Sequence, residues 1–165
     1  MVILGIDPGL ATMGYGVLDA ARGNFSVIDY GVVTTPKDTP LPKRLALLEE
    51  GVRALFDKYK PDCVSIEELF FTKNITNGIM VAEARGVILL TAHSIVGEEV
   101  YEYTPNQIKQ AVTGYGGADK IQMQLMVQAL LRLKKVPRPD DAADALAVAI
   151  CHAQTNRLSG QFRIG

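Results

Sequence analysis

Four acidic residues occupy positions from which they can act together. Asp7 follows the apolar run 2–6, and Glu67 follows the run 63–66. Asp141 and Asp144 are three residues apart, a spacing that puts two side chains on one face of a helix, about 5–6 Å apart. Carboxylate oxygens without thiols or imidazoles suit Mg²⁺ and Mn²⁺. A pair of such ions can activate water and stabilise the leaving oxygen of a phosphodiester. The pattern predicts a Mg²⁺ site for phosphodiester hydrolysis, with two ions per subunit favoured and Mn²⁺ as a substitute. The number of ions bound without DNA stays open.

Each of these acids also fits an ordinary structural role. Asp7 stands before a Pro-Gly turn, and Asp144 suits the first turn of a helix, where the dipole favours negative charge. Glu67 also fits a surface acid at a strand end, with Glu68 as a competitor because neighbours on a strand face opposite ways. Asp140 follows a proline and fits a helix N-cap. Clustered carboxylates repel unless cations neutralise them, so the joint interpretation favours a metal site.

Strands and helices must bring these acids together. The segments 2–6, 12–19 and 25–35 read as an antiparallel meander, with a turn at 21–24. Strands at 63–67 and 100–103 then alternate with helices at 42–59, 77–96, 105–113, 119–133 and 140–156. This order predicts an α/β fold with a mixed five-stranded sheet flanked by helices. We expect one domain over 1–156 and a polar C-terminal tail over 157–165 that frays.

Composition fits one soluble domain. The chain has 165 residues, 48% apolar and 21% charged. Apolar runs break before the roughly 18 residues of a membrane span, and the N-terminus has no basic region of a signal peptide. We therefore expect a cytoplasmic protein without a membrane partner. Cys63 and Cys151 form no CxxC pair and read as buried thiols. His152 lies roughly 16 Å along the helix from Asp141, too far to share its site.

The balance of charge leaves room for a nucleic-acid partner. There are 17 basic and 18 acidic residues, so the net charge is −1. Without the four nominated carboxylates the sum is 17 minus 14, or +3. The segment 103–139 has six basic residues against one acid, Asp119: Lys109, Lys120, Arg132, Lys134, Lys135 and Arg138. This segment is either a contact surface for phosphates or a solvated helix face.

Several motifs, in order along the chain, resemble the RuvC family of bacterial crossover junction endodeoxyribonucleases. They are GIDPG at 5–9, GYG at 14–16, SIEELF at 65–70, ARG at 84–86, QIKQ at 107–110, ADK at 118–120 and DAADALA at 141–147. The resemblance implies a ribonuclease H-like fold. It also implies a homodimer that makes paired symmetric nicks in four-way Holliday junction DNA during recombination and repair, with the motor proteins RuvA and RuvB as partners.

The resemblance also assigns residues. By motif position the catalytic and metal-binding acids are Asp7, Glu67, Asp141 and Asp144, with Asp7 bridging the ions. Lys109 and Lys120 match DNA-contacting lysines, and Arg85 lies in the helix motif and is grouped with them. Phe70 matches a base-contacting phenylalanine, whereas its neighbour Phe71 is expected in the core. Acidic neighbours at Glu68 and Asp140 leave open which carboxylate of each pair faces the metals.

Several alternatives stay open. The helix at 77–96 is apolar on most sides, which suggests a dimer partner, although a helix enclosed within its own domain would look the same. The GIDPG turn also opens ATP-binding folds of the actin and sugar-kinase type, but those need a second half that this chain is too short to hold. The sequence also leaves room for a ribonuclease H-like enzyme that acts on RNA, and for a relative that binds DNA without cutting it.

Overall fold

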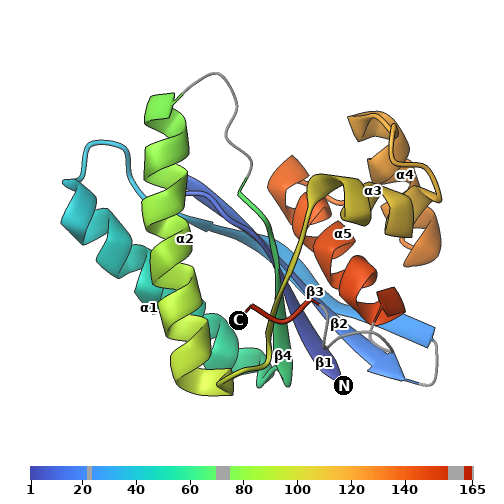
Figure 1. The fold of residues 1–165 in the computed structure, drawn as a ribbon, viewed down its shortest axis with the longest axis horizontal. Helices are drawn as coiled ribbons and strands as arrows, with labels where there is room; N and C mark the ends of the chain where they lie inside the picture. The colour runs from blue at the N-terminus through green and yellow to red at the C-terminus, as the bar shows by residue number, and fades with distance from the viewer. Residues whose placement is uncertain (22–23, 70–74, 156–161, 165) are drawn as a thin grey trace.

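The predicted mixed sheet is confirmed by a computed structural model, which describes residues 1–21, 24–69, 75–155 and 162–164. Its five strands run in the order β3-β2-β1-β4-β5 (Figure 1). β1 is antiparallel to β2, which is antiparallel to β3, whereas β1 and β4 are parallel, as are β4 and β5. The bounds are β1 (Val2–Asp7), β2 (Thr12–Ala21), β3 (Asn24–Thr34), β4 (Cys63–Glu67) and β5 (Val100–Tyr103).

All five predicted helices are present, namely α1 (Leu41–Tyr59), α2 (Ile75–Val96), α3 (Pro105–Thr113), α4 (Lys120–Leu130) and α5 (Asp140–Thr155). Helix α4 ends before the predicted residue 133. Arg132 has a φ of 52°, a left-handed backbone that does not continue a helix. Asp119 caps the start of α4 by accepting a hydrogen bond from the Gln122 N–H, so the helix proper begins one residue later than predicted.

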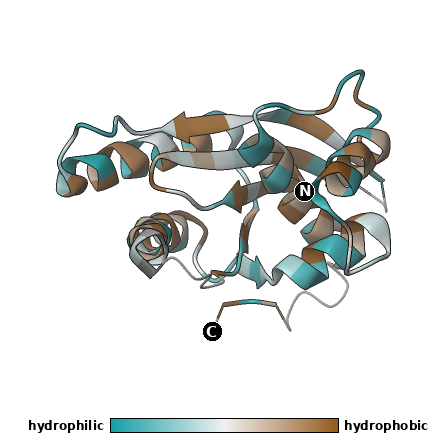
Figure 2. Cartoon of the chain, turned by 90° about the horizontal axis from the view of Figure 1, so that it is seen from above, coloured by the Kyte–Doolittle hydropathy of each residue, from teal (hydrophilic) through white to brown (hydrophobic). Residues whose placement is uncertain are grey.

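Two apolar cores lie on opposite faces of the sheet. Helices α1 and α2 cover one face, and α5 lies against the other with α3 and α4 beside it (Figure 1). Alternate strand residues supply the two cores: Leu4 and Ile6 belong to the α1–α2 side, whereas Ile3 and Cys63 belong to the α5 side. Figure 2 shows apolar colours along the strands between these layers. The alternation therefore decides which strand residues can face α5.

A polar network lies inside the α5 core. His152 Nε2 is 3.4 Å from the Cys63 Sγ, and its Nδ1 is 2.7 Å from the Tyr103 hydroxyl. Burial lowers the pKa of His152 to about 4, so the imidazole is neutral at ordinary pH. Both cysteines are free and buried, as predicted. His152 is thus committed to the core, and the expectation that it stays out of the acidic site is confirmed.

The tail was expected to fray, but its last described residues, 162–164, are hydrogen-bonded to β5. The Ile164 N–H donates to the Val100 carbonyl at 3.0 Å, and the Glu102 N–H donates to the Phe162 carbonyl at 2.9 Å. The Phe162 ring packs against Tyr103, with 5.0 Å between ring centroids. β5 is an edge strand, and its unpaired backbone groups attract this segment, which composition alone did not reveal. The domain boundary at 156 stays a prediction.

Helix α2 corrects the expectation about apolar length. Between Gly78 and Val96 it is long and apolar enough to cross a membrane, with a mean hydropathy of 1.5. A single helix that passes such a test is weak evidence, because core helices of soluble proteins pass it too. Here α2 packs on α1, and its Arg85 pairs with Glu102 of β5. Length and composition alone therefore do not assign this helix to a membrane.

Candidate active site

The carboxyl ends of β1 and β4 bring Asp7 and Glu67 to one edge of the sheet. The two strands are parallel, with Ile6 in register with Ile66. Both isoleucines face the α1–α2 core, so the residues that follow them point to the α5 face. The adjacency predicted for these two acids is therefore present.

Close packing of α5 on the sheet brings in the other two acids. A Cβ atom on Gly14 would overlap the Asp141 carbonyl oxygen, and one on Gly5 would overlap the Ala145 carbonyl oxygen. The missing side chains let the first turns of α5 rest directly on β1 and β2. That contact fixes Asp141 and Asp144 beside the sheet edge. Both glycines belong to the motifs GIDPG and GYG, but nothing in those motifs indicates this packing role.

The acids act on one another electrostatically. The pKa of Asp7 is raised to about 8, first by burial and then by the charges of Glu67, Asp144 and Asp141. Burial and the Asp144 charge raise the pKa of Glu67 to about 7. Burial is also the main cause that raises the pKa of Asp144. Such shifts arise where carboxylates share a partly buried site without enough positive charge.

The side chains as they stand do not form a closed metal cage. In the described part of the chain, no three His, Cys, Asp or Glu residues are gathered closely enough to hold an ion. The mutual pKa effects nevertheless show that the four carboxylates are electrostatic neighbours, and repulsion is a sufficient reason for them to stay apart. Mg²⁺ usually takes only one or two carboxylates and fills its other positions with water and phosphate oxygens. The donor set therefore fits Mg²⁺ bound in an open site.

Two lysines stand over the acids. The Lys120 Nζ lies 3.2 Å from an Asp140 oxygen and 3.7 Å from an Asp144 oxygen. The Lys109 charge lowers the pKa of Glu67. Both lysines line a cavity of about 220 Å³ with Glu67 and Asp144, walled by Pro105, Ile108, Met123, Ala147 and Val148. The structure thus places both predicted lysines beside the predicted acids.

The acidic neighbours are now distinguished. Asp140 pairs with Lys120 and with Arg138, and it is not among the charges that raise the pKa of Asp7. Glu68 is not among the charges that raise the pKa of Asp7 or of Glu67, and its N–H donates to the Tyr103 carbonyl at 2.9 Å. These contacts favour Glu67 over Glu68 and set Asp140 at the rim of the site.

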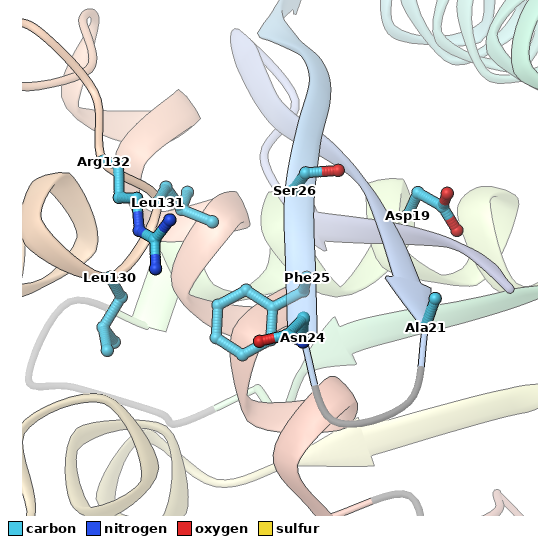
Figure 3. Close-up of a pocket in the computed structure, with 8 residues that line it drawn as sticks. All are labelled: Asp19, Ala21, Asn24, Phe25, Ser26, Leu130, Leu131 and Arg132. Carbon is cyan, nitrogen blue, oxygen red and sulfur yellow. The ribbon is translucent and has the colours of Figure 1, made fainter.

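Two other predicted DNA contacts are not placed at the cavity. Arg85 donates to Glu102 at 2.5 Å, and its side chain is only 17% exposed. That pair ties α2 to the sheet face opposite α5, so a contact between Arg85 and DNA stays a prediction. Phe70 and Phe71 lie outside the described residues. A separate cavity of about 590 Å³ lies between the end of α4 and the β2–β3 hairpin, and none of the four nominated acids lines it. Figure 3 shows the residues that line this cavity.

Comparisons with known proteins agree on one family. The family model for crossover junction endodeoxyribonuclease RuvC matches residues 3–152. A curated relative of that name from Clostridioides difficile (strain 630) is 55% identical over 159 residues, which cover 96% of this chain and 93% of the relative. Another from Chloroflexus aggregans (strain MD-66 / DSM 9485) is 56% identical over 164 residues, covering 99% of each.

A solved structure gives the same answer for the fold. T. thermophilus RuvC in complex with Holliday junction substrate matches with a TM-score of 0.90 at 35% identity. The match covers 99% of this chain and 98% of that one. The ribonuclease H-like fold is therefore confirmed. With motifs, fold and full-length similarity in agreement, the chain belongs to the RuvC family of crossover junction endodeoxyribonucleases.

Proposed function

We propose that this chain is a metal-dependent endonuclease that makes paired nicks in four-way DNA junctions during recombination and repair. The observation that carries the proposal is the set of mutually interacting carboxylates at the ends of β1 and β4 and the start of α5. The solved family member with a TM-score of 0.90 is described with a Holliday junction substrate. An electronegative pocket next to two lysines suits a phosphodiester whose charge is shared between protein cations and metal ions.

Asp7, Glu67, Asp141 and Asp144 would hold the metal, with Mg²⁺ as the natural ion, two per subunit, and Mn²⁺ as a substitute. When bound, such ions lower the pKa of water and stabilise the leaving oxygen of the cut strand. Burial of the carboxylates strengthens their hold on a cation. Glu67 and Asp7 are partly enclosed, so their charges are weakly screened and hold a cation more strongly than surface acids would.

Lys109 and Lys120 would hold the phosphate next to the cut. Lys120 is already beside the acids, through its pairs with Asp140 and Asp144. A phosphate entering the cavity of about 220 Å³ would meet both ammonium groups. Such contacts fix the position of the backbone without reading its sequence. Phe70, which the family motif places at a base contact, would stack on a base near the junction centre.

A homodimer would supply two matched sites. Four-way junctions are pseudo-symmetric, and an isologous dimer presents the same site twice. Helix α2 offers the surface: in Figure 2 it is seen nearly end-on with mostly apolar colours, and Ile79, Leu90 and Ile95 are 52%, 73% and 44% exposed. We extend the proposal to RuvA and RuvB as the motor partners and to the cytoplasm as the location, both from family membership.

The test is cleavage of a synthetic four-way junction with Mg²⁺, compared with a plain duplex and an RNA–DNA hybrid. Paired nicks in the junction alone support the proposal. Cutting confined to the hybrid would favour a ribonuclease, and binding without cutting would favour a non-catalytic relative. Asp7→Asn supplies the matched control, because it removes one metal-binding carboxylate with little change of shape. It should abolish cutting while junction binding with Ca²⁺ persists, since looser coordination positions water poorly.

A further inference from the structure

The connection between α4 and α5 carries positive charge that the proposed nuclease site does not use. Over residues 131–139 it has four basic residues and no acid. We call these the basic stripe: Arg132, Lys134, Lys135 and Arg138. All four are exposed. Arg138 pairs with Asp140, whereas the other three have no ion-pair partner among the described residues.

The stripe begins at the end of the sheet far from the acids. Helix α4 starts at Lys120, beside Asp144, and its 11 residues advance about 16 Å at 1.5 Å each. The β1–β2 register gives a similar length for the sheet. Val2 pairs with Asp19 at the end near the β2–β3 hairpin, and Asp7 pairs with Gly14 at the end with the acids. Five steps of about 3.3 Å give roughly 17 Å between these ends. The far end of α4 therefore lies about 17 Å from the acids.

From there the chain returns to the acids. Arg132 lies at the β2–β3 hairpin, where it lines the cleft of about 590 Å³ with Phe25. Arg138 lies at the other end, paired with Asp140 at the rim of the nuclease site. Lys134 and Lys135 stand between them in the chain. The four cations thus mark a path that leads from the hairpin to the acidic cavity.

The far cleft is lined by one cation, Arg132, and by one acid, Asp19. Figure 3 shows the Arg132 guanidinium across the gap from the Phe25 ring, with Asn24 and Ser26 on the same strand as the ring. The Asp19 carboxylate points away from Arg132 in this view, and it pairs with the ammonium group of Met1 at 3.2 Å. An anion in the cleft would therefore meet Arg132 without close competition from that acid.

We propose that the basic stripe binds the phosphate backbone of one duplex arm of the junction. Duplex DNA rises about 3.4 Å per base pair, so Arg132 would meet a phosphate about five base pairs from the cut. Residues 131–139 contain no aromatic side chain, and the Phe25 ring of the cleft packs against the α5 core. Both observations argue against a single strand, since single strands bind by stacking on aromatics. The inference rests on the proposed nuclease function and extends it to the arms.

The variants are Arg132→Gln and the double change Lys134→Gln with Lys135→Gln. Lys60→Gln is a matched control, because Lys60 is exposed and has a φ of 46°, close to the 52° of Arg132, but follows α1 in the other helix layer. Thermal melting should be the same for all of them. Junction affinity is then measured with Ca²⁺ over a salt series. One substrate has arms of about 15 base pairs, and the other has hairpin-closed arms of about four, too short to reach Arg132.

With long arms, each lost phosphate contact should weaken binding about five- to tenfold at 0.1 M salt and reduce the salt slope by about 0.9. With short arms Arg132→Gln should match the wild type, whereas the double change should keep part of its loss. Lys60→Gln should match the wild type on both substrates. An equal loss for Arg132→Gln on both substrates, or an unchanged salt slope for both variants, would overturn the proposal that the basic stripe binds a duplex arm. Cutting of junctions with affinity independent of arm length would refute the stripe alone. Binding that depends on arm length without any cutting would refute the nuclease proposal alone.

Discussion

Replacing Asp7 with Asn should make the metal-free protein more stable. The pKa of this buried carboxyl rises from 3.8 to about 8 in the fold. The folded protein therefore keeps the Asp7 proton up to about pH 8, whereas the unfolded chain releases it near pH 4. Unfolding is then favoured by proton release, so stability falls as pH rises between these values. Asn has the same shape and no such proton, so the variant escapes the loss.

The magnitude follows from the pKa difference at 1.36 kcal/mol per pH unit. At pH 7 the unfolded carboxyl is about three units above its pKa, which corresponds to about 4 kcal/mol. Side-chain rearrangement that separates the charges reduces this, so we expect about 2–4 kcal/mol. For a chain of this size that is a rise of roughly 5–15 °C in melting temperature.

The assay is thermal melting of wild type and Asp7→Asn in a chelator at about pH 5 and about pH 7.5. The gap between them should be small at the lower pH and large at the higher one. Added Mg²⁺ should then stabilise the wild type more than the variant, because binding to the folded state alone adds stability. If Asp7→Asn melts at or below the wild type at the higher pH, Asp7 is not buried among like charges.

Three further outcomes are expected from the proposed function. Changing Lys109 or Lys120 to Ala should weaken junction binding most at moderate salt and flatten the salt slope by about one unit in filter binding; an unchanged slope would leave them as solvated lysines. Leu90→Asp, on the exposed face of α2, should convert dimer to monomer in light scattering, and a wild type that is monomeric with and without junction would contradict the dimer. Phe70→Ala should fold normally but cut slowly in single-turnover assays, whereas Phe71→Ala should lose about 3–5 kcal/mol if fully buried.

Sequence patterns predicted the sheet edge because its signals are local. Each of the acids Asp7 and Glu67 ends a short apolar run, and the helix between those runs favours parallel neighbours. The position of α5 was less accessible, because it depends on glycines opposite it. Nothing in the sequence around Gly14 says that the Asp141 carbonyl will rest there. Long-range packing of this kind fixes a site more finely than any periodicity can predict.

For Arg85, the motif match identifies the residue but does not determine what its side chain contacts. Its place in the helix motif suggested a DNA contact, which stays a prediction. In the fold its guanidinium pairs with Glu102 on the face opposite the acids. The face of the sheet on which Glu102 lies depends on how β5 pairs with β4. That pairing is determined by residues far apart in the chain. Charge alone cannot distinguish an arginine that anchors a helix from one that contacts phosphate.

The packing that creates the site also lowers the stability of the fold. Asp7 and Glu67 have raised pKa values because α5 closes over the strand ends, and the glycines that permit this closure remove side chains that would otherwise add to the core. The apolar clusters on both sheet faces supply the stability that offsets this cost. A bound cation would relieve the repulsion directly. The site is therefore least stable when empty, which is the condition under which carboxylates have most to gain from a metal ion.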